Sequence, residues 1–131
     1  MMVLVDTTVW IDFFLANPYP HVETLENLIA EREDICLCGI ILTEVLQGIR
    51  EDSEFKRTRD LLANLVFLPM QYSIFIRSAE IYRNLRQKGV TIRKPVDCMI
   101  AAVAIEHDIP LLHNDNDFLP IEKHFGLKRL K

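Results

Sequence analysis

Short apolar runs alternate along this chain with longer segments in which apolar residues recur at helical spacing. The first run, Met1–Val5, predicts a buried strand that ends at the polar residue Asp6. The next apolar positions recur at i, i+1, i+4 and i+5 and predict a helix that stops before Asn17; they are Val9, Trp10, Phe13 and Phe14. The chain therefore opens as a strand followed directly by a helix.

The same alternation continues to the end of the chain. Further helices are expected over residues 21–32, 39–50, 53–65, 73–88 and 96–107, and further strands over 35–38, 66–70, 110–112 and 127–130, with a turn over 114–118. Strands separated by helices form βαβ units, and these units build a mostly parallel sheet flanked by helices. The pattern thus predicts the α/β class.

Length and composition favour one globular domain covering residues 1–131. The chain is half hydrophobic and 26% charged, which fits a packed core. Its longest uncharged stretch, residues 61–76, contains polar residues and is too short for a membrane span. The apolar N-terminus lacks the basic region of a secretory signal.

The three cysteines indicate a reducing compartment. They are odd in number and have no C-x-x-C spacing, which argues against a disulfide framework or a zinc site; they are Cys36, Cys38 and Cys98. We therefore expect buried thiols and a cytoplasmic protein.

Acidic residues follow the expected strands or begin an expected helix. Asp6 ends the first strand, Asp97 lies in the first turn of an apolar helix, and Asp115 and Asp117 follow the strand over 110–112. Each position alone has an ordinary explanation: a helix N-cap, a favourable helix dipole and a polar turn, respectively. A Ca²⁺ loop is also conceivable for the last pair, but the other EF-hand ligands are missing.

Glu44 lies inside an otherwise uncharged stretch, residues 40–49. It is either a boundary residue whose head reaches water or a buried carboxylate that needs a partner. In parallel sheets, ligands bind beyond the carboxyl ends of the strands, so all of these acids could meet in one crevice. Clustered carboxylates need a compensating charge, and oxygen ligands favour Mg²⁺ or Mn²⁺. Such a site suits phosphodiester hydrolysis.

Four segments, residues 5–12, 43–48, 97–102 and 112–118, resemble in order and spacing the PIN-domain ribonucleases, and more narrowly the VapC toxins of prokaryotic type II toxin–antitoxin pairs. The resemblance implies a three-layer α/β/α PIN-like domain with a central, mostly parallel sheet of four to five strands. It also implies that the catalytic and metal-binding acids are Asp6, Glu44, Asp97 and Asp115, with Thr8 and Asp117 in supporting roles. His113 departs from the pattern, because many members have Thr there.

The activity implied by this resemblance is a Mg²⁺-dependent endoribonuclease, with Mn²⁺ as an alternative ion. Such a toxin cuts RNA and thereby stops translation and growth. The resemblance further implies a homodimer and a VapB-like antitoxin, joined in a heterotetramer or a larger complex, in which the antitoxin's C-terminal segment covers the groove.

The net charge of −4 argues against a nucleic-acid partner only if the acids are spread evenly. Between residues 81 and 96 the chain has no acid and five bases, which are candidate RNA-binding residues or a solvated helix face: Arg83, Arg86, Lys88, Arg93 and Lys94. The metal site and this stretch together make RNA a plausible substrate despite the net charge.

Two other classes of function compete with the nuclease. The first is a non-catalytic PIN-like module that binds RNA or protein, against which the complete set of acids argues. The second is another Mg²⁺-binding α/β protein. A haloacid-dehalogenase phosphatase needs an acid where Thr8 stands, and a receiver domain needs an acid where Thr7 stands.

Overall fold

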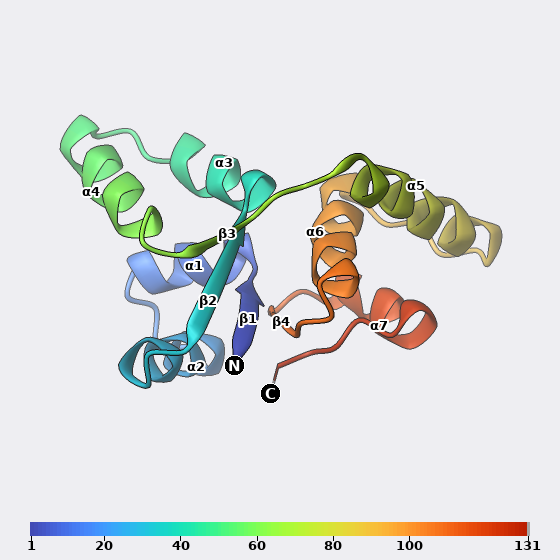
Figure 1. Cartoon of the computed structure of the whole chain (residues 1–131), viewed down its shortest axis with the longest axis horizontal. Coiled ribbons are helices and arrows are strands. Elements are labelled where there is room, and N and C mark those ends of the chain that lie inside the picture. Colours follow the sequence, from blue (N-terminus) through green and yellow to red (C-terminus); the bar gives the residue numbers. More distant parts are fainter. Residues whose placement is uncertain (131) are drawn as a thin grey trace.

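Four parallel strands form the central sheet of the computed structural model, which describes residues 1–130 (Figure 1). The strands lie in the order β3-β2-β1-β4 and are β1 (Met2–Val5), β2 (Asp34–Cys38), β3 (Val66–Leu68) and β4 (Leu111–Leu112). Their apolar residues are mostly buried, as expected for a parallel sheet covered on both faces. The prediction of a mostly parallel sheet is confirmed, and the short β3 lies at its edge.

Helices cover both faces of this sheet. Figure 1 shows α1 and α2 on one side and α5, α6 and α7 on the other, while α3 contacts both α1 and α6. The helical elements are α1 (Thr7–Phe14), α2 (Pro20–Ala30), α3 (Gly39–Gln47), α4 (Asp52–Leu62), α5 (Tyr72–Gln87), α6 (Pro95–Glu106), the 3-10 helix η1 (Asn116–Phe118) and α7 (Leu119–Phe125). The expected three-layer α/β/α arrangement is confirmed.

The C-terminal region differs from the expectation in two ways. The sequence pattern did not predict α7, which ends at Gly126 with φ at 69°, a left-handed conformation that glycine adopts readily. Residues 127–130 do not form the expected strand. Leu111 donates to the carbonyl of Lys128 at 2.8 Å and accepts from the N–H of Leu130 at 3.0 Å, so that only Arg129 pairs with β4.

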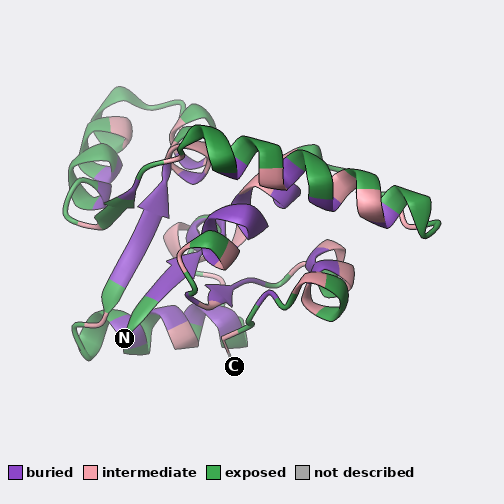
Figure 2. Cartoon of the chain, turned by 45° about the vertical axis from the view of Figure 1, so that its right-hand side comes forward, coloured by how far each residue is buried: buried purple, intermediate pink, exposed green. Residues whose placement is uncertain are grey.

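The most buried elements are β1, β2, β4 and α6, whereas two of the three residues of β3 and the outer face of α5 are exposed (Figure 2). This burial explains why α6 is apolar almost throughout. The one acid in its first turn, Asp97, is therefore an exception among the buried residues of this helix. The three cysteines are buried free thiols, as expected. Within residues 1–130, no helix is both long and apolar enough to cross a membrane.

Candidate active site

Asp6 lies where the neighbouring strands β1 and β4 end together. Its N–H donates to the carbonyl of Leu112, the last residue of β4, at 2.9 Å. The side chain is 3% exposed, and the hydroxyl of Thr8 donates to Asp6 Oδ2 at 2.8 Å. Although Asp6 occupies the N-cap position of α1, its side chain makes no cap hydrogen bond. The carboxylate is therefore available to the crevice, and Thr8 orients it.

Three further carboxylates meet beside the first turn of α6. Ligand oxygens of Asp97, Asp115 and Asp117 all lie within 4.8 Å of one another. Asp97 comes from α6, while the other two come from the loop that follows β4 and from η1. The loop is shaped by Asp115 itself, whose Oδ1 accepts a hydrogen bond from the N–H of Asp117 at 2.9 Å. Acids far apart in sequence thus form one group, the acidic trio.

The electrostatics of the trio also involve Asp6. Burial raises the pKa of Asp97 to about 7, and the negative charges of Asp6, Asp115 and Asp117 push it the same way, whereas Lys94 lowers it. Burial likewise raises the pKa of Asp6, an effect that the Thr8 hydroxyl opposes. Asp6 is therefore close enough to the trio to share its electrostatic field, and the site needs a compensating positive charge.

Glu44 lies near this group but is not part of the trio. It is half-buried on α3, and its Oε1 accepts a hydrogen bond from the hydroxyl of Thr7 at 2.7 Å. Because Thr7 follows Asp6 directly, this bond brings α3 to the start of α1. Glu44 was expected to be either a boundary residue whose head reaches water or a buried carboxylate with a partner. It is partly buried and has a partner, so it combines features of both.

The residues present fit a hard divalent cation. Asp97 Oδ2 is buried and has no hydrogen-bond partner within residues 1–130. A buried carboxylate oxygen without a partner is costly, and a cation held by carboxylate oxygens would satisfy it. The donors are all oxygens, which is the ligand type preferred by Mg²⁺ and Mn²⁺ rather than zinc.

Comparison with known proteins identifies the family. The family model described as PIN domain matches residues 3–123. The chain belongs to the PIN-domain family. Among its relatives, Ribonuclease VapC11 from Mycobacterium tuberculosis and VapC ribonuclease Mb1587 from Mycobacterium bovis are each 36% identical to it over 119 residues, covering 89% of this chain and 89% of the relative. Within the PIN-domain family, it is therefore a member of the VapC group.

Solved structures share this PIN fold. A toxin–antitoxin complex from Klebsiella pneumoniae contains a chain with 25% identity and a TM-score of 0.71, with 91% of this chain and 92% of that chain covered. VapBC2 from Rickettsia felis, bound to a DNA fragment from their promoter, gives 22% identity and a TM-score of 0.78, covering 99% and 98% of the two chains. The second likeness concerns the fold alone.

Two of the five candidate RNA-binding bases lie at the acids of this PIN domain. Lys94 Nζ lies 3.5 Å from Asp115 Oδ2, and Arg93 Nε lies 3.4 Å from Asp117 Oδ2. Burial acts to lower the pKa of Lys94, but the carboxylates of Asp97 and Asp115 outweigh it and raise the pKa. These two bases therefore supply part of the positive charge that the acids need.

The other three bases do not make such contacts. Arg83, Arg86 and Lys88 are exposed in and just after the last turns of α5, and the contacts of the latter two are local. Lys88 Nζ donates to Asn84 Oδ1 at 2.6 Å, and the Arg86 guanidinium lies over the Tyr82 ring at 5.6 Å. The structure brings only the end of the basic stretch to the PIN-domain acids.

His113, the residue that departs from the VapC pattern, is a buried structural residue. Its side chain is fully covered, its Nε2 lies 2.5 Å from Glu122 Oε2, and its Nδ1 accepts from the N–H of Asp115 at 3.2 Å. Because Nδ1 accepts, Nε2 carries the proton and donates to Glu122. Burial lowers the pKa of His113, which favours this neutral form.

Sequence reasoning missed two residues that hold the acids in place. Thr7 holds Glu44, and Glu122 of α7 holds His113. Thr7 directly follows Asp6, so its place in the strand-to-helix junction was a usable signal. No sequence signal pointed to Glu122, because its helix was not predicted and its partner lies nine residues away.

Proposed function

We propose that this chain, as a single PIN domain over residues 1–131, is a VapC-like endoribonuclease toxin that hydrolyses RNA and thereby inhibits translation and growth. The observation that carries the proposal is the buried, unpartnered Oδ2 of Asp97 beside Asp115, Asp117 and Asp6. The relatives that are 36% identical are named ribonucleases. A packed core does not retain an unsatisfied carboxylate oxygen without a stability cost, which a bound cation removes.

In this proposal, Asp6, Asp97 and Asp115 hold Mg²⁺, with Mn²⁺ as a substitute, and Glu44 holds it directly or through water. Thr8 orients Asp6, and Asp117 supports the loop of Asp115. When bound, the ion orients the scissile phosphate, makes water a stronger nucleophile and stabilises the departing oxygen. By family resemblance, cleavage leaves a 5′-phosphate and a 3′-hydroxyl.

Arg93 and Lys94 then have a second role. Each has an exposed side chain that forms an ion pair with a carboxylate of the acidic trio. A divalent cation would compensate the same carboxylates, so the two side chains would become free to contact RNA phosphates. Arg83, Arg86 and Lys88 extend this basic surface along α5 in the proposal. Positive charge beside the acids is what lets a protein of net charge −4 bind RNA.

The proposed partners follow from the same site. A VapB-like antitoxin would cover the crevice with its C-terminal segment, and an inserted Arg would suit the negative charge of the acids. A solved relative is a toxin–antitoxin complex. We propose a homodimer that forms a heterotetramer or larger assembly with the antitoxin, in the cytoplasm.

Growth tests decide between this toxin and the alternative, a non-catalytic PIN-like module. Induced expression of the wild type should arrest growth, and Asp6→Ala or Asp97→Ala should relieve the arrest while the protein still folds. The control is Asp60→Ala, which removes an exposed acid of α4 and should stay toxic. Sequencing of RNA ends should find new 5′-phosphate ends only with the wild type and this control.

Persistent toxicity of both active-site variants would contradict the nuclease. Purified wild type that binds RNA in Mg²⁺ or Mn²⁺ but leaves it intact would favour the binding module.

A further inference from the structure

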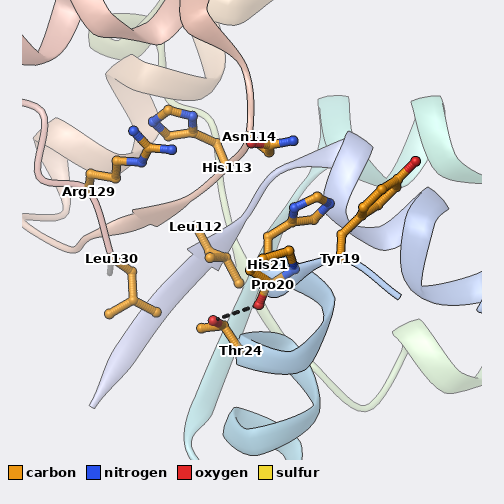
Figure 3. Close-up of a pocket in the computed structure, with 9 residues that line it drawn as sticks. All are labelled: Tyr19, Pro20, His21, Thr24, Leu112, His113, Asn114, Arg129 and Leu130. Atoms are coloured by element: carbon orange, nitrogen blue, oxygen red, sulfur yellow. Dashed lines mark hydrogen bonds between the residues drawn. The ribbon is translucent and has the colours of Figure 1, made fainter. Parts of the chain in front are cut away.

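A cavity lies next to the loop that carries Asp115. It is a cavity of about 420 Å³ between the start of α2, the loop after β4 and the C-terminal segment (Figure 3). Asn114 lines it and directly precedes Asp115 in the chain. The cavity and the acidic trio therefore share one loop.

One wall of the cavity is a fixed aromatic surface. The rings of Tyr19 and His21 stack, with centroids 5.3 Å apart and planes 24° apart. His21 is buried and held by Asp12, whose Oδ2 lies 2.6 Å from His21 Nε2, and Asn17 donates to the other oxygen of Asp12 at 3.1 Å. Tyr19 is 49% exposed. One face of the Tyr19 ring is thus held by a fixed ring, and the exposed part of Tyr19 is open to a ligand.

The other wall supplies positive charge and an amide. Figure 3 shows Arg129 on the wall formed by the C-terminal segment, with its guanidinium beside His113, and Tyr19 on the opposite wall, with Asn114 and His21 between them. Pairing with Leu111 fixes the backbone of Arg129 beside β4. Within residues 1–130, Arg129 forms no ion pair, in contrast to Arg93 and Lys94. An arginine without a carboxylate partner is suited to a phosphate.

We propose that this cavity is a subsite for one nucleotide of the RNA strand, with the base stacked on Tyr19 and a phosphate bound by Arg129. The inference rests on the proposed ribonuclease function. A flat aromatic face and a guanidinium on opposite walls match the two parts of a nucleotide, whereas an acidic peptide would use only the charge. The subsite holds a nucleotide next to the scissile bond, because its wall continues into the loop of Asp115.

Variants with matched controls test this subsite. Tyr19→Ala removes the stacking face, Tyr19→Phe keeps it, and Arg129→Gln removes the charge. The controls are Tyr72→Ala, an exposed tyrosine at the start of α5, and Arg32→Gln, an exposed arginine at the opposite end of α2. All of them are measured on the full chain with Mg²⁺ and an RNA oligonucleotide that the wild type cleaves.

Tyr19→Ala and Arg129→Gln should each raise KM about tenfold and leave kcat within about threefold, as expected when one base stack or one phosphate interaction is removed. Tyr19→Phe and both controls should match the wild type. Unchanged KM values for both Tyr19→Ala and Arg129→Gln would overturn the subsite.

Direct measurement of nucleotide binding tests the subsite independently of RNA cleavage. In ¹H–¹⁵N NMR titrations, nucleoside 5′-monophosphates should shift the amide signals of residues 19, 21–24 and 113–114 in the wild type. The shifts should disappear in Tyr19→Ala and Arg129→Gln. If the wild type cleaves no RNA, the proposed function fails and this titration alone decides the subsite; absence of these shifts would then overturn it.

Discussion

The Nδ1 atom of His113 accepts a hydrogen bond from the backbone N–H of Asp115 at 3.2 Å, and its Nε2 donates to Glu122. The imidazole therefore joins α7 to the loop that carries two acids of the trio. Its ring also packs on Phe118, with centroids 4.6 Å apart. A residue that looked like a departure from the family pattern is thus a support for the acidic loop.

Replacing His113 should separate its two hydrogen bonds. Asn at this position can place an acceptor near the position of Nδ1, so His113→Asn should keep Mn²⁺ affinity within about threefold while removing the bond to Glu122. His113→Leu keeps the volume but leaves the Asp115 N–H without an acceptor, and should weaken Mn²⁺ binding about tenfold or more. Isothermal titration with Mn²⁺ measures both. Equal affinities for the wild type and His113→Leu would show that the loop does not need the imidazole.

The stability of the metal-free protein should depend on the protonation of Asp97. Its pKa is raised from 3.8 to about 7, mainly by burial, so between about pH 4 and pH 7 the folded state holds a proton that the unfolded state has released. The free energy of unfolding should therefore fall as pH rises through this window, by up to a few kcal/mol, on the order of 1.4 per unit of pKa shift. Urea unfolding from pH 4 to pH 8 measures this.

The control for this pH dependence is Asp97→Asn, which cannot titrate. Burial also lowers the pKa of His113, so the informative quantity is the difference between the wild type and Asp97→Asn. That difference should change through the window and level off above about pH 7. A difference that is constant with pH would contradict the raised pKa. Added Mn²⁺ should stabilise the wild type more at pH 8 than at pH 5, because protons compete with the ion.

The Thr8 hydroxyl should be necessary for metal affinity. It donates to Asp6 Oδ2 at 2.8 Å, which orients the carboxylate and favours its charged form. Thr8→Val removes the donor at nearly constant volume and should weaken Mn²⁺ binding roughly 10- to 100-fold, while Thr8→Ser should restore it. Calorimetric titration provides the affinities. If the Thr8→Val and Thr8→Ser variants bind Mn²⁺ equally well, the Thr8 hydroxyl has no part in orienting Asp6.

Lys94 should contribute to RNA binding through a phosphate. In the presence of a divalent cation, Lys94→Gln should weaken binding of single-stranded RNA and reduce the slope of log K against log salt by about 0.7, the change expected when one lysine no longer neutralises a phosphate. Fluorescence anisotropy at several salt concentrations gives the slope. Lys123→Gln, an exposed lysine on α7, is the matched control and should leave the slope unchanged. An unchanged slope for Lys94→Gln would mean that the charge of Lys94 compensates the acids but does not contact an RNA phosphate.

The elements of this fold with continuous apolar stretches were predictable from sequence. The apolar run before Asp6 and the apolar stretch after Pro95 predicted β1 and α6, because an element that is buried on all sides is apolar almost throughout. The helix α7 was missed, although Pro120 near its start and Gly126 after its end are common helix boundary residues. Residues 127–130 were predicted to form a strand, yet only Arg129 pairs with β4. Strand formation depends on which backbone lies beside a segment, and the local sequence does not specify this.

The sequence by itself determined which residues are acidic and that they follow buried strands or begin a buried helix. Only the tertiary structure decided that Asp97, Asp115 and Asp117 form the trio, and that Glu44 is held by Thr7. The same holds for Tyr19 and Arg129, which are 110 positions apart in numbering and line one cavity. The physical reason is that local propensity depends on neighbours within a few residues. Distances between side chains from different elements are set by how the helices pack on the sheet.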